Sequence, residues 1–389
     1  MVGVVGGGQL ARMMQPAAVA LGVQLRVLSE APDASAAQVV PRSPVGDHRD
    51  EAAVTTFAAD VDVLTFDHEH VPGELLARLE ATGVAVRPGR AALAHAQDKI
   101  VMRRRLTELG VPCPRWAVVH DEAELTAFGD LVGWPVVLKT PRGGYDGKGV
   151  QVVADATSAS DWLARGGGEG LLAEQRVDFT RELAVLIARS PSGQAAAWPV
   201  AQTLQVDGVC REVVVPAPDL DADLAAAATH IGLRIGGELG VVGVLAVELF
   251  QTADPGAGAV GPWADGEGGV LVNELAMRPH NSGHWSIDGS VTSQFEQHLR
   301  AVLDLPLGDP RARAPWTVMV NVLGGEFPEM YRAYRHVMAR DPGVKVHMYG
   351  KDVRPGRKVG HVTVCGDDLD DCLERARHAT DYLTGTIEE

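Results

Sequence analysis

The chain has 389 residues, enough for two or three domains that each bury a core of their own. Acidic residues outnumber basic ones by 51 to 35, which argues against a nucleic-acid partner, because such partners are bound by Lys and Arg. No apolar run approaches the roughly 20 residues of a membrane span, so no membrane partner is expected.

Two further features concern the cellular compartment. The start, MVGVVGGGQL, has no basic flank followed by a long apolar stretch, so we expect no signal peptide. The four cysteines are scattered without C-x-x-C spacing, which indicates neither a zinc site nor a disulfide framework. We therefore predict a cytoplasmic protein.

The N-terminal segment, residues 1–95, alternates strand and helix signals. Strands are predicted within residues 2–6, 23–30 and 61–71, and a helix over 9–22. This alternation is typical of a parallel sheet with helices on its faces, so a Rossmann-like domain is predicted here.

A dinucleotide fingerprint lies in the same segment. Gly6, Gly8 and Ala11 match G-x-G-x-x-A between a strand and a helix, and Glu30 follows at the end of the next strand. An NAD-dependent oxidoreductase is therefore one alternative for the function.

The stretch DHEH, residues 67–70, has the composition of a metal cluster. If it ends a strand, Asp67 and Glu69 point to one side and His68 and His70 to the other. One metal ion could not gather all four, so we favour a polar contact to a ligand through Glu69 over a metal site.

Residues 96–305 contain more strands and Gly-rich turns, which predicts an α+β region. Strands are expected within 134–141, 149–155, 170–177, 181–190 and 208–218, a helix over 219–240, and a loop without chemistry over 252–269. The composition shifts again near residue 306, and residues 306–389 are predicted to form a small C-terminal domain.

The loop TPRGGYDGKGV, residues 140–150, has two interpretations. Its glycines could turn backbone N–H groups toward phosphate oxygens. It is not a P-loop, because Gly149 follows Lys148 where Ser or Thr would be needed. The other interpretation is a hairpin turn, since Asp-Gly at 146–147 is a strong turn dipeptide. The loop alone does not decide between them.

Two apolar strands each carry a carboxylate near the end, Glu248 in VGVLAVELF and Glu274 in GGVLVNELA. A buried carboxylate needs a compensating partner, and two such strands joined by a loop could bring both side by side. Because Mg²⁺ is held by one or two carboxylates plus substrate phosphates, this pattern suggests a magnesium–nucleotide site. The alternative is a pair of surface-facing glutamates.

Cationic and polar residues accompany these strands. Lys139 ends an apolar strand beside the glycine loop and Lys99 precedes it, so both could meet phosphates. A polar run with Arg278, His280 and Asn281 follows Glu274, and an Arg fork suits a planar oxyanion. The segment KDVRPGRK, residues 351–358, is a dense basic cluster in an acidic chain.

Together these segments resemble those of the 5-(carboxyamino)imidazole ribonucleotide synthases, ATP-grasp ligases of purine biosynthesis. The resemblance rests on GGGQLARMM, DVLTFDHEHVP, LKTPRGGYDGKG, GVLAVELF, VNELAMRPHNSGHW and KDVRPGRKVGHV, in this order over nearly the whole chain. It implies a Rossmann-like domain, a two-lobed ATP-grasp region and a small C-terminal domain, in a homodimer. The implied reaction carboxylates the amine of aminoimidazole ribonucleotide, using ATP and bicarbonate through carboxyphosphate.

The resemblance also implies roles for individual residues. Mg²⁺, with Mn²⁺ as a substitute, would be held by Glu248 and Glu274. ATP would contact Lys99, Lys139, Gly144, Tyr145, Asp146, Gly147, Lys148, Gly149, Val150, Glu174, Gln175, Arg176, Val177, Glu182, Gln205, Asn273 and Glu274. The ribonucleotide would contact Gln9, Leu10, Glu69, Tyr145, Asp146, Asn281, Lys351, Arg357 and Lys358. Catalytic roles fall to Arg278, His280, Asp146, Tyr145 and Lys351.

In the implied mechanism, Arg278 orients bicarbonate, His280 handles a proton near neutral pH and Asp146 fixes the attacking amine. The glycine loop would close over the phosphates. The chain departs from the family pattern at Asp67 and His70, where E-x-E-N is usual, and at Gln205, where histidine is expected. Another ATP-grasp ligase with a different acceptor is the nearest alternative.

Overall fold

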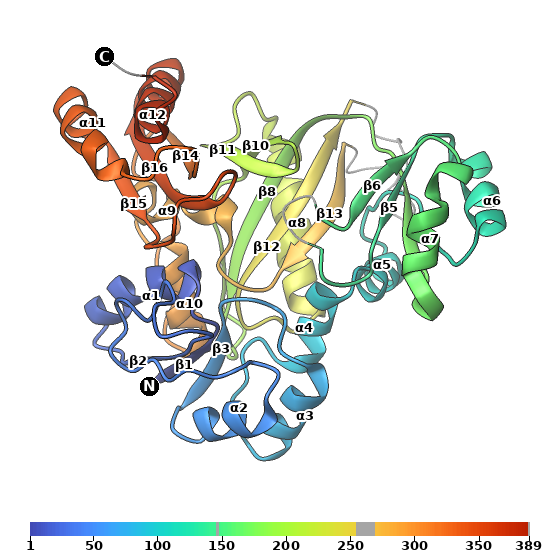
Figure 1. Ribbon diagram of the computed structural model, residues 1–389, viewed down its shortest axis with the longest axis horizontal. Helices are drawn as coiled ribbons and strands as arrows, with labels where there is room; N and C mark the ends of the chain where they lie inside the picture. The colour runs from blue at the N-terminus through green and yellow to red at the C-terminus, as the bar shows by residue number, and fades with distance from the viewer. Residues whose placement is uncertain (145–147, 254–268, 388–389) are drawn as a thin grey trace.

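The computed structural model describes residues 1–144, 148–253 and 269–387. Figure 1 shows an N-terminal unit in blue, a small lobe in teal and green, and a long sheet that ends in the orange and red C-terminal segment. Within the described residues no helix has the length and apolar character needed to cross a bilayer.

The N-terminal unit is built on a parallel sheet in the order β2-β1-β3. Its strands are short and mostly buried, which is characteristic of parallel sheets covered by helices. The elements are β1 (Val2–Val5), α1 (Gln9–Ala20), β2 (Leu25–Leu28), α2 (Glu51–Ala58), β3 (Val63–Phe66), α3 (Gly73–Ala81) and α4 (Arg90–Gln97). The predicted alternation of strand and helix is confirmed.

The small lobe is an antiparallel sheet in the order β4-β7-β5-β6, with its own apolar core. Its strands are β4 (Trp116–Val119), β5 (Val136–Lys139), β6 (Val150–Val153) and β7 (Leu171–Gln175). Its helices are α6 (Glu122–Val132), η1 (Thr157–Ala159), α7 (Ser160–Gly166) and η2 (Gly167–Glu169). The preceding helix α5 (Lys99–Glu108) packs instead in the core shared by the N-terminal unit and the large sheet.

Strands β5 and β6 pair as a hairpin, so residues 140–149 are its connecting segment. The Thr140 N–H donates to the Gly149 carbonyl at 2.9 Å. Gly149 has φ of +76°, and a Cβ there would lie 2.5 Å from Thr140 Oγ1, so glycine is required to close the hairpin. The segment therefore connects two paired strands, but the Asp-Gly turn at 146–147 lies outside the described residues, so the phosphate-loop interpretation stays a prediction beside it.

The large sheet is antiparallel and runs β13-β12-β8-β10-β11-β14-β16-β15, with β9 paired to β8. The bounds are β8 (Phe179–Arg189), β9 (Ala195–Ala197), β10 (Ala201–Val206), β11 (Val209–Val215), β12 (Gly243–Thr252), β13 (Val270–Ala276), β14 (Trp316–Leu323), β15 (Lys345–Met348) and β16 (Lys358–Gly366). Because β11 pairs with β14, the C-terminal segment continues the central sheet.

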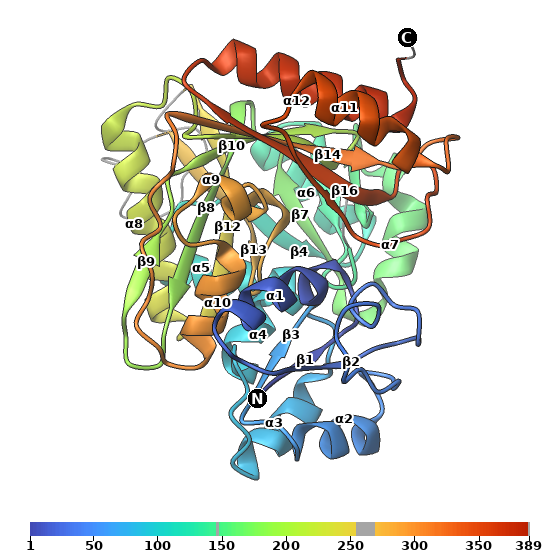
Figure 2. The same ribbon diagram turned by 90° about the vertical axis from the view of Figure 1, so that its left-hand side faces the viewer.

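Helices cover both faces of this sheet. Alternate residues of β8 belong to different cores: Val185 packs in the cluster that contains α8 (Ala222–Glu238), and Leu186 in the cluster that contains Trp285. Figure 2 shows α11 (Tyr334–Arg340) and α12 (Leu369–Thr384) at the end of the molecule opposite the N-terminal unit. The remaining helices are η3 (Asn281–Gly283), α9 (Ser286–Gly289), α10 (Gln294–Val302) and η4 (Met330–Ala333).

Candidate active site

A cavity of about 1530 Å³ lies where the N-terminal unit, both lobes and the C-terminal strands meet. Predicted site residues from all these parts line it. They are Gln9, Leu10, Glu69, Lys99, Lys139, Gly144, Lys148, Val150, Glu174, Gln175, Arg176, Val177, Glu182, Gln205, Glu248, Asn273, Glu274, Arg278, His280, Asn281, Lys351, Arg357 and Lys358. Gly149 does not line the cavity, and Tyr145, Asp146 and Gly147 fall outside the described residues.

The two strand carboxylates are cross-strand neighbours. Strands β12 and β13 pair so that Glu248 lies directly opposite Glu274, which confirms the predicted side-by-side arrangement and removes the surface-facing alternative. Burial, together with the nearby Glu274 and Glu182, raises the pKa of Glu248 to about 7. A cation between the two strands would relieve this cost, because opposite charge favours the ionised form.

Two lysines lie beside the Glu248–Glu274 pair. Lys99 Nζ, at the start of α5, lies 2.7 Å from Glu274 Oε1. Lys139 Nζ, at the end of β5, lies 3.0 Å from Asn273 Oδ1. Lys99, Lys139, Glu248 and Glu274 therefore form one charged surface of the cavity, which we call the charged floor. Such a surface suits a phosphate chain and a divalent cation.

Glu174 is held beneath this floor. Its carboxylate pairs with Lys139 at 2.6 Å and with the fully buried Arg103. Burial alone would raise the pKa of Glu174, but Arg103 and Lys139 outweigh it and lower the value to about 2. This carboxylate is committed to the two cations in this structure.

Arg103 was not predicted from the sequence. It lies four residues after Lys99, and residues at this spacing share one face of a helix. That face of α5 delivers Lys99 to Glu274 and Arg103 to Glu174. Helical spacing from Lys99 was the signal that could have identified it.

The oxyanion residues lie on the loop after β13. Arg278 Nε donates to Glu69 Oε2 at 2.7 Å, and the Met277 N–H donates to Glu69 Oε1 at 3.2 Å. Glu69 thus contacts the protein's own arginine in this structure. It orients the guanidinium that the sequence pattern singled out.

The prediction that His280 titrates near neutral pH is wrong for this structure. Burial, followed by the charges of Arg278 and Lys358, lowers the pKa of His280 to about 3. Its Nδ1 lies 2.9 Å from Ser282 Oγ, and its Nε2 lies 3.6 Å from Glu248 Oε1. The ring is a neutral imidazole at pH 7 and can serve as a hydrogen-bonding group.

Buried amides fix this loop. Gln294, from α10, accepts from the His280 N–H at 2.8 Å and donates to the His280 carbonyl at 2.8 Å. Asn281 forms a reciprocal amide pair with Asn321 of β14, so much of its hydrogen-bonding capacity is used inside the protein. No local sequence signal identifies Gln294 or Asn321, because each meets its partner only through the tertiary fold.

The basic cluster meets the N-terminal unit at the far end of the cavity. Lys351 Nζ donates to Gln9 Oε1 at 2.6 Å, and Gln9 Nε2 lies 3.4 Å from His284 Nε2. Arg357 and Lys358 line the same cavity. Cations gathered here suit a phosphate group.

The dinucleotide fingerprint is occupied by the chain's own carboxylates. Asp67 Oδ1 accepts from the Ala11 N–H at 2.7 Å, and Glu30 Oε2 accepts from the Gly7 N–H at 3.1 Å. A Cβ at Gly8 would lie 2.0 Å from Asp67 Oδ2. The place where a pyrophosphate would meet the start of α1 is therefore filled, which argues against NAD.

Comparison with known proteins agrees with this architecture. The family model described as the ATP-grasp domain matches residues 104–295. The ribonucleotide synthetase preATP-grasp domain matches residues 1–97, and the phosphoribosylaminoimidazole carboxylase C-terminal domain matches residues 317–375. Fold and site thus define an ATP-grasp protein.

Similar proteins of known name show which family of ATP-grasp proteins the chain resembles. The N5-carboxyaminoimidazole ribonucleotide synthase of Mycobacterium tuberculosis is 54% identical, over 99% of this chain and 88% of the relative. That of Corynebacterium ammoniagenes is 48% identical, over 98% and 91%. The chain belongs to the N5-carboxyaminoimidazole ribonucleotide synthase family of ATP-dependent ligases, as its sequence motifs predicted.

Solved structures of the same family share the fold over the whole chain. The synthetase from Thermus thermophilus has a TM-score of 0.85 and 38% identity, and covers 100% of this chain and 99% of its own. The synthase from Aspergillus clavatus, in complex with ADP and 5-aminoimidazole ribonucleotide, has a TM-score of 0.86 and 28% identity, and covers 99% and 98%.

Proposed function

We propose that the protein carboxylates the amine of 5-aminoimidazole ribonucleotide, using ATP and bicarbonate, in purine biosynthesis. The observation that carries this proposal is the shared cavity, which joins the Glu248–Glu274 pair to the oxyanion arginine and the basic cluster. The complex of the Aspergillus clavatus relative with ADP and the ribonucleotide supports the choice of both substrates.

The charged floor would bind the nucleotide. Lys99 and Lys139 would meet its phosphates, and Glu182, whose pKa burial raises to about 7, would lie at the ribose. Glu248 and Glu274 fit Mg²⁺, because they offer carboxylate oxygens at adjacent positions. When bound, the ion neutralises phosphate charge, and Mn²⁺ has similar ligand preferences.

The remaining residues would bring the two other substrates together. Arg278 would hold bicarbonate through its planar guanidinium while bicarbonate attacks the γ-phosphate and gives carboxyphosphate and ADP. Gln9, Glu69, Lys351, Arg357 and Lys358 would hold the ribonucleotide. Its amine would then take the carboxyl group from carboxyphosphate, with release of inorganic phosphate and loss of a proton from the amine. His280 would donate or accept a hydrogen bond as a neutral ring.

Several family features remain predictions for this chain. They are the domain limits 1–95, 96–305 and 306–389, the roles of Tyr145, Asp146 and Gly147, assembly as a homodimer, and location in the cytoplasm. The residue roles and the homodimer follow from the resemblance to the family, whereas the domain limits and the location also rest on composition and patterning.

Release of ADP tests the function. With Mg²⁺, ATP and bicarbonate present, we expect the ribonucleotide to stimulate ADP release strongly, and removal of bicarbonate to abolish the stimulation. Bicarbonate-dependent release that is indifferent to the ribonucleotide would retain the ATP-grasp chemistry but exclude this acceptor.

A further inference from the structure

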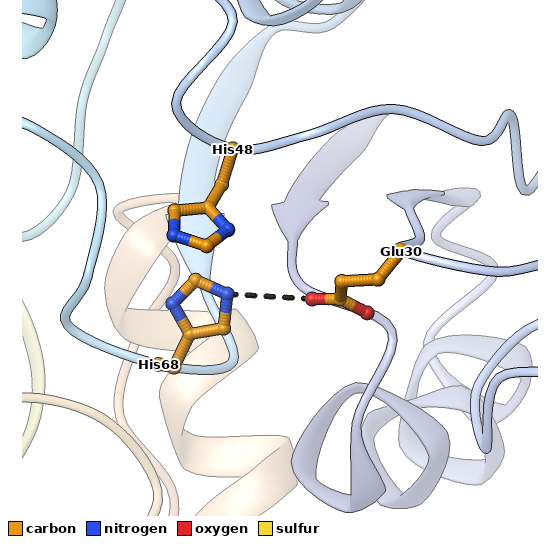
Figure 3. Close-up of side chains that lie close together, drawn as sticks. All are labelled: Glu30, His48 and His68. Atoms are coloured by element: carbon orange, nitrogen blue, oxygen red, sulfur yellow. Dashed lines mark ion pairs between the residues drawn. The ribbon is translucent and has the colours of Figure 1, made fainter.

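Three loops of the N-terminal unit bring together a carboxylate and two imidazoles that the proposed reaction does not use. Glu30 follows β2, His48 precedes α2 and His68 follows β3. One ligand atom from each lies within 4.8 Å of the others. Figure 3 shows the two rings one above the other, with the Glu30 carboxylate directed toward His68.

Three of the four imidazole nitrogens in this cluster lack ordinary partners. Neither Nδ1 nor Nε2 of His48, nor Nε2 of His68, makes a hydrogen bond among the described residues, and these atoms are buried. The nearest carboxylate oxygens are an ion-pair distance away, 3.6 Å from His48 to Asp47 and 3.5 Å from His68 to Glu30. Buried polar atoms usually have a hydrogen-bond partner. The lack of one at these three nitrogens therefore suggests that they bind a ligand.

We propose that Glu30, His48 and His68 bind one divalent transition-metal ion of the zinc type. Atoms that all lie within 4.8 Å of one another share a point at most about 2.8 Å from each (4.8/√3), against about 2.0–2.2 Å for bonds from zinc to nitrogen or oxygen. Inward movements of less than about 1 Å would therefore complete three bonds.

Two imidazole nitrogens and one carboxylate oxygen favour some metal ions over others. Imidazole nitrogens suit zinc, cobalt and nickel, whereas Mg²⁺ prefers an all-oxygen site such as the Glu248–Glu274 pair. An anion is the wrong occupant, because the facing His68 and the Gly7 amide, against the opposing effect of burial, lower the pKa of Glu30 to about 2 and keep it charged. Burial, followed by the neighbouring His68, lowers the pKa of His48, which favours the neutral ring that a metal needs.

Binding requires one local change in hydrogen bonding. The His70 N–H donates to His68 Nδ1 at 3.2 Å, which leaves the ring proton of a neutral His68 on Nε2. A metal on Nε2 moves that proton to Nδ1, so this bond must break. No proton leaves the protein at this residue, and Glu30 keeps its second oxygen on the Gly7 N–H.

The metal would link the three loops that carry Glu30, His48 and His68, next to the candidate active site. His68 directly precedes Glu69, the partner of Arg278, and directly follows Asp67, which holds the start of α1. None of the three ligands is among the residues proposed to bind phosphate, although His68 also lines the cavity. Its effect is to stabilise the edge of the N-terminal sheet that faces the cavity.

Zinc titration of the full chain, stripped by a chelator and held in excess Mg²⁺, tests the proposal. We expect one zinc ion per chain, and affinity at least tenfold weaker for His48→Gln and for Glu30→Gln, since loss of even an outer partner costs about 10–100-fold. Glu30→Gln keeps an acceptor for Gly7 and removes only the charge. Cobalt substitution should give a visible absorption band that both variants lose.

The matched control is His120→Gln. His120 Nδ1 lies 2.9 Å from Glu124 on the surface, so it offers a His–Glu pair without a second histidine, and zinc affinity should be unchanged. The proposal is overturned if the wild type binds no zinc, or if the two variants bind it as the wild type does. It is equally overturned if Glu248→Gln alone abolishes binding, because zinc would then occupy the magnesium site.

Discussion

Arg278 shows at the scale of one residue how the protein itself orients a candidate site residue. Its side chain is partly buried at the cavity wall, and its Nε pairs with Glu69 at 2.7 Å. Burial opposes the charge, but Glu69 outweighs this effect and raises the pKa of Arg278. Glu69 thereby holds the guanidinium in one orientation, which would spare reorganisation if Arg278 binds bicarbonate as proposed.

Replacing Arg278 by Ala should lower the turnover number by roughly 10²-fold or more, the scale of losing one preorganised oxyanion donor. ADP release at saturating substrates measures it. Arg311→Ala, which removes an exposed arginine paired with Asp309, is the control and should leave turnover unchanged. Near-normal turnover of Arg278→Ala would exclude this residue from catalysis.

At the scale of elements, pairing of β12 with β13 brings together the two carboxylates proposed to hold a cation. Two carboxylates opposite one another on neighbouring strands repel, and burial adds to the cost that raises the pKa of Glu248 to about 7. The strands tolerate this arrangement without a cation because Lys99 lies 2.7 Å from Glu274. The two carboxylates therefore lower the folding stability at the position where the proposed phosphate chemistry would need charged groups.

Replacing Glu248 by Gln should stabilise the metal-free protein at pH 8, by at most about 3 kcal/mol if the whole pKa shift is recovered. The same variant should lose ATP turnover. Thermal unfolding with and without Mg²⁺ measures both parts: Mg²⁺ should raise the midpoint of the wild type and leave that of Glu248→Gln unchanged. An equal rise in both proteins would place the cation elsewhere.

The elements also show what could be predicted. The apolar runs around Glu248 and Glu274 indicated the strands, and a loop between them implied antiparallel neighbours, so this pair was accessible from sequence. Asp67 was not, because its role depends on α1 and β3 meeting in space. The His280 prediction failed for a related reason: its pKa depends on burial and on Arg278 and Lys358, and Lys358 lies far along the chain.

At the scale of the whole molecule, His298 ties the N-terminal unit to the large sheet. Its Nε2 lies 2.8 Å from Thr65 Oγ1 of β3, and its Nδ1 accepts from the Val244 N–H of β12 at 3.1 Å. Burial lowers the pKa of His298 to about 3. The ring must therefore stay neutral while the protein is folded.

This burial makes stability depend on pH. Below about 6.5 the unfolded chain takes up a proton on this histidine that the folded protein refuses, so stability is lost as pH falls from about 6.5 toward 3. Between pH 7.5 and 5.5 the loss is about 1 kcal/mol. Urea unfolding of His298→Gln should show a decrease smaller by that amount, whereas an unchanged pH dependence would contradict the assignment.

The continuous hydrogen bonding from β13 to β15 has a consequence for how the substrates meet. Glu248 lies on β12, and Lys358 begins β16 in the same sheet. If Glu248 and Lys358 bind the phosphoryl donor and the acceptor as proposed, both substrates are held by a single continuous sheet. The distance between Glu248 and Lys358 is then fixed by the fold of this sheet. Any approach of the two substrates would depend on movement of other parts of the protein.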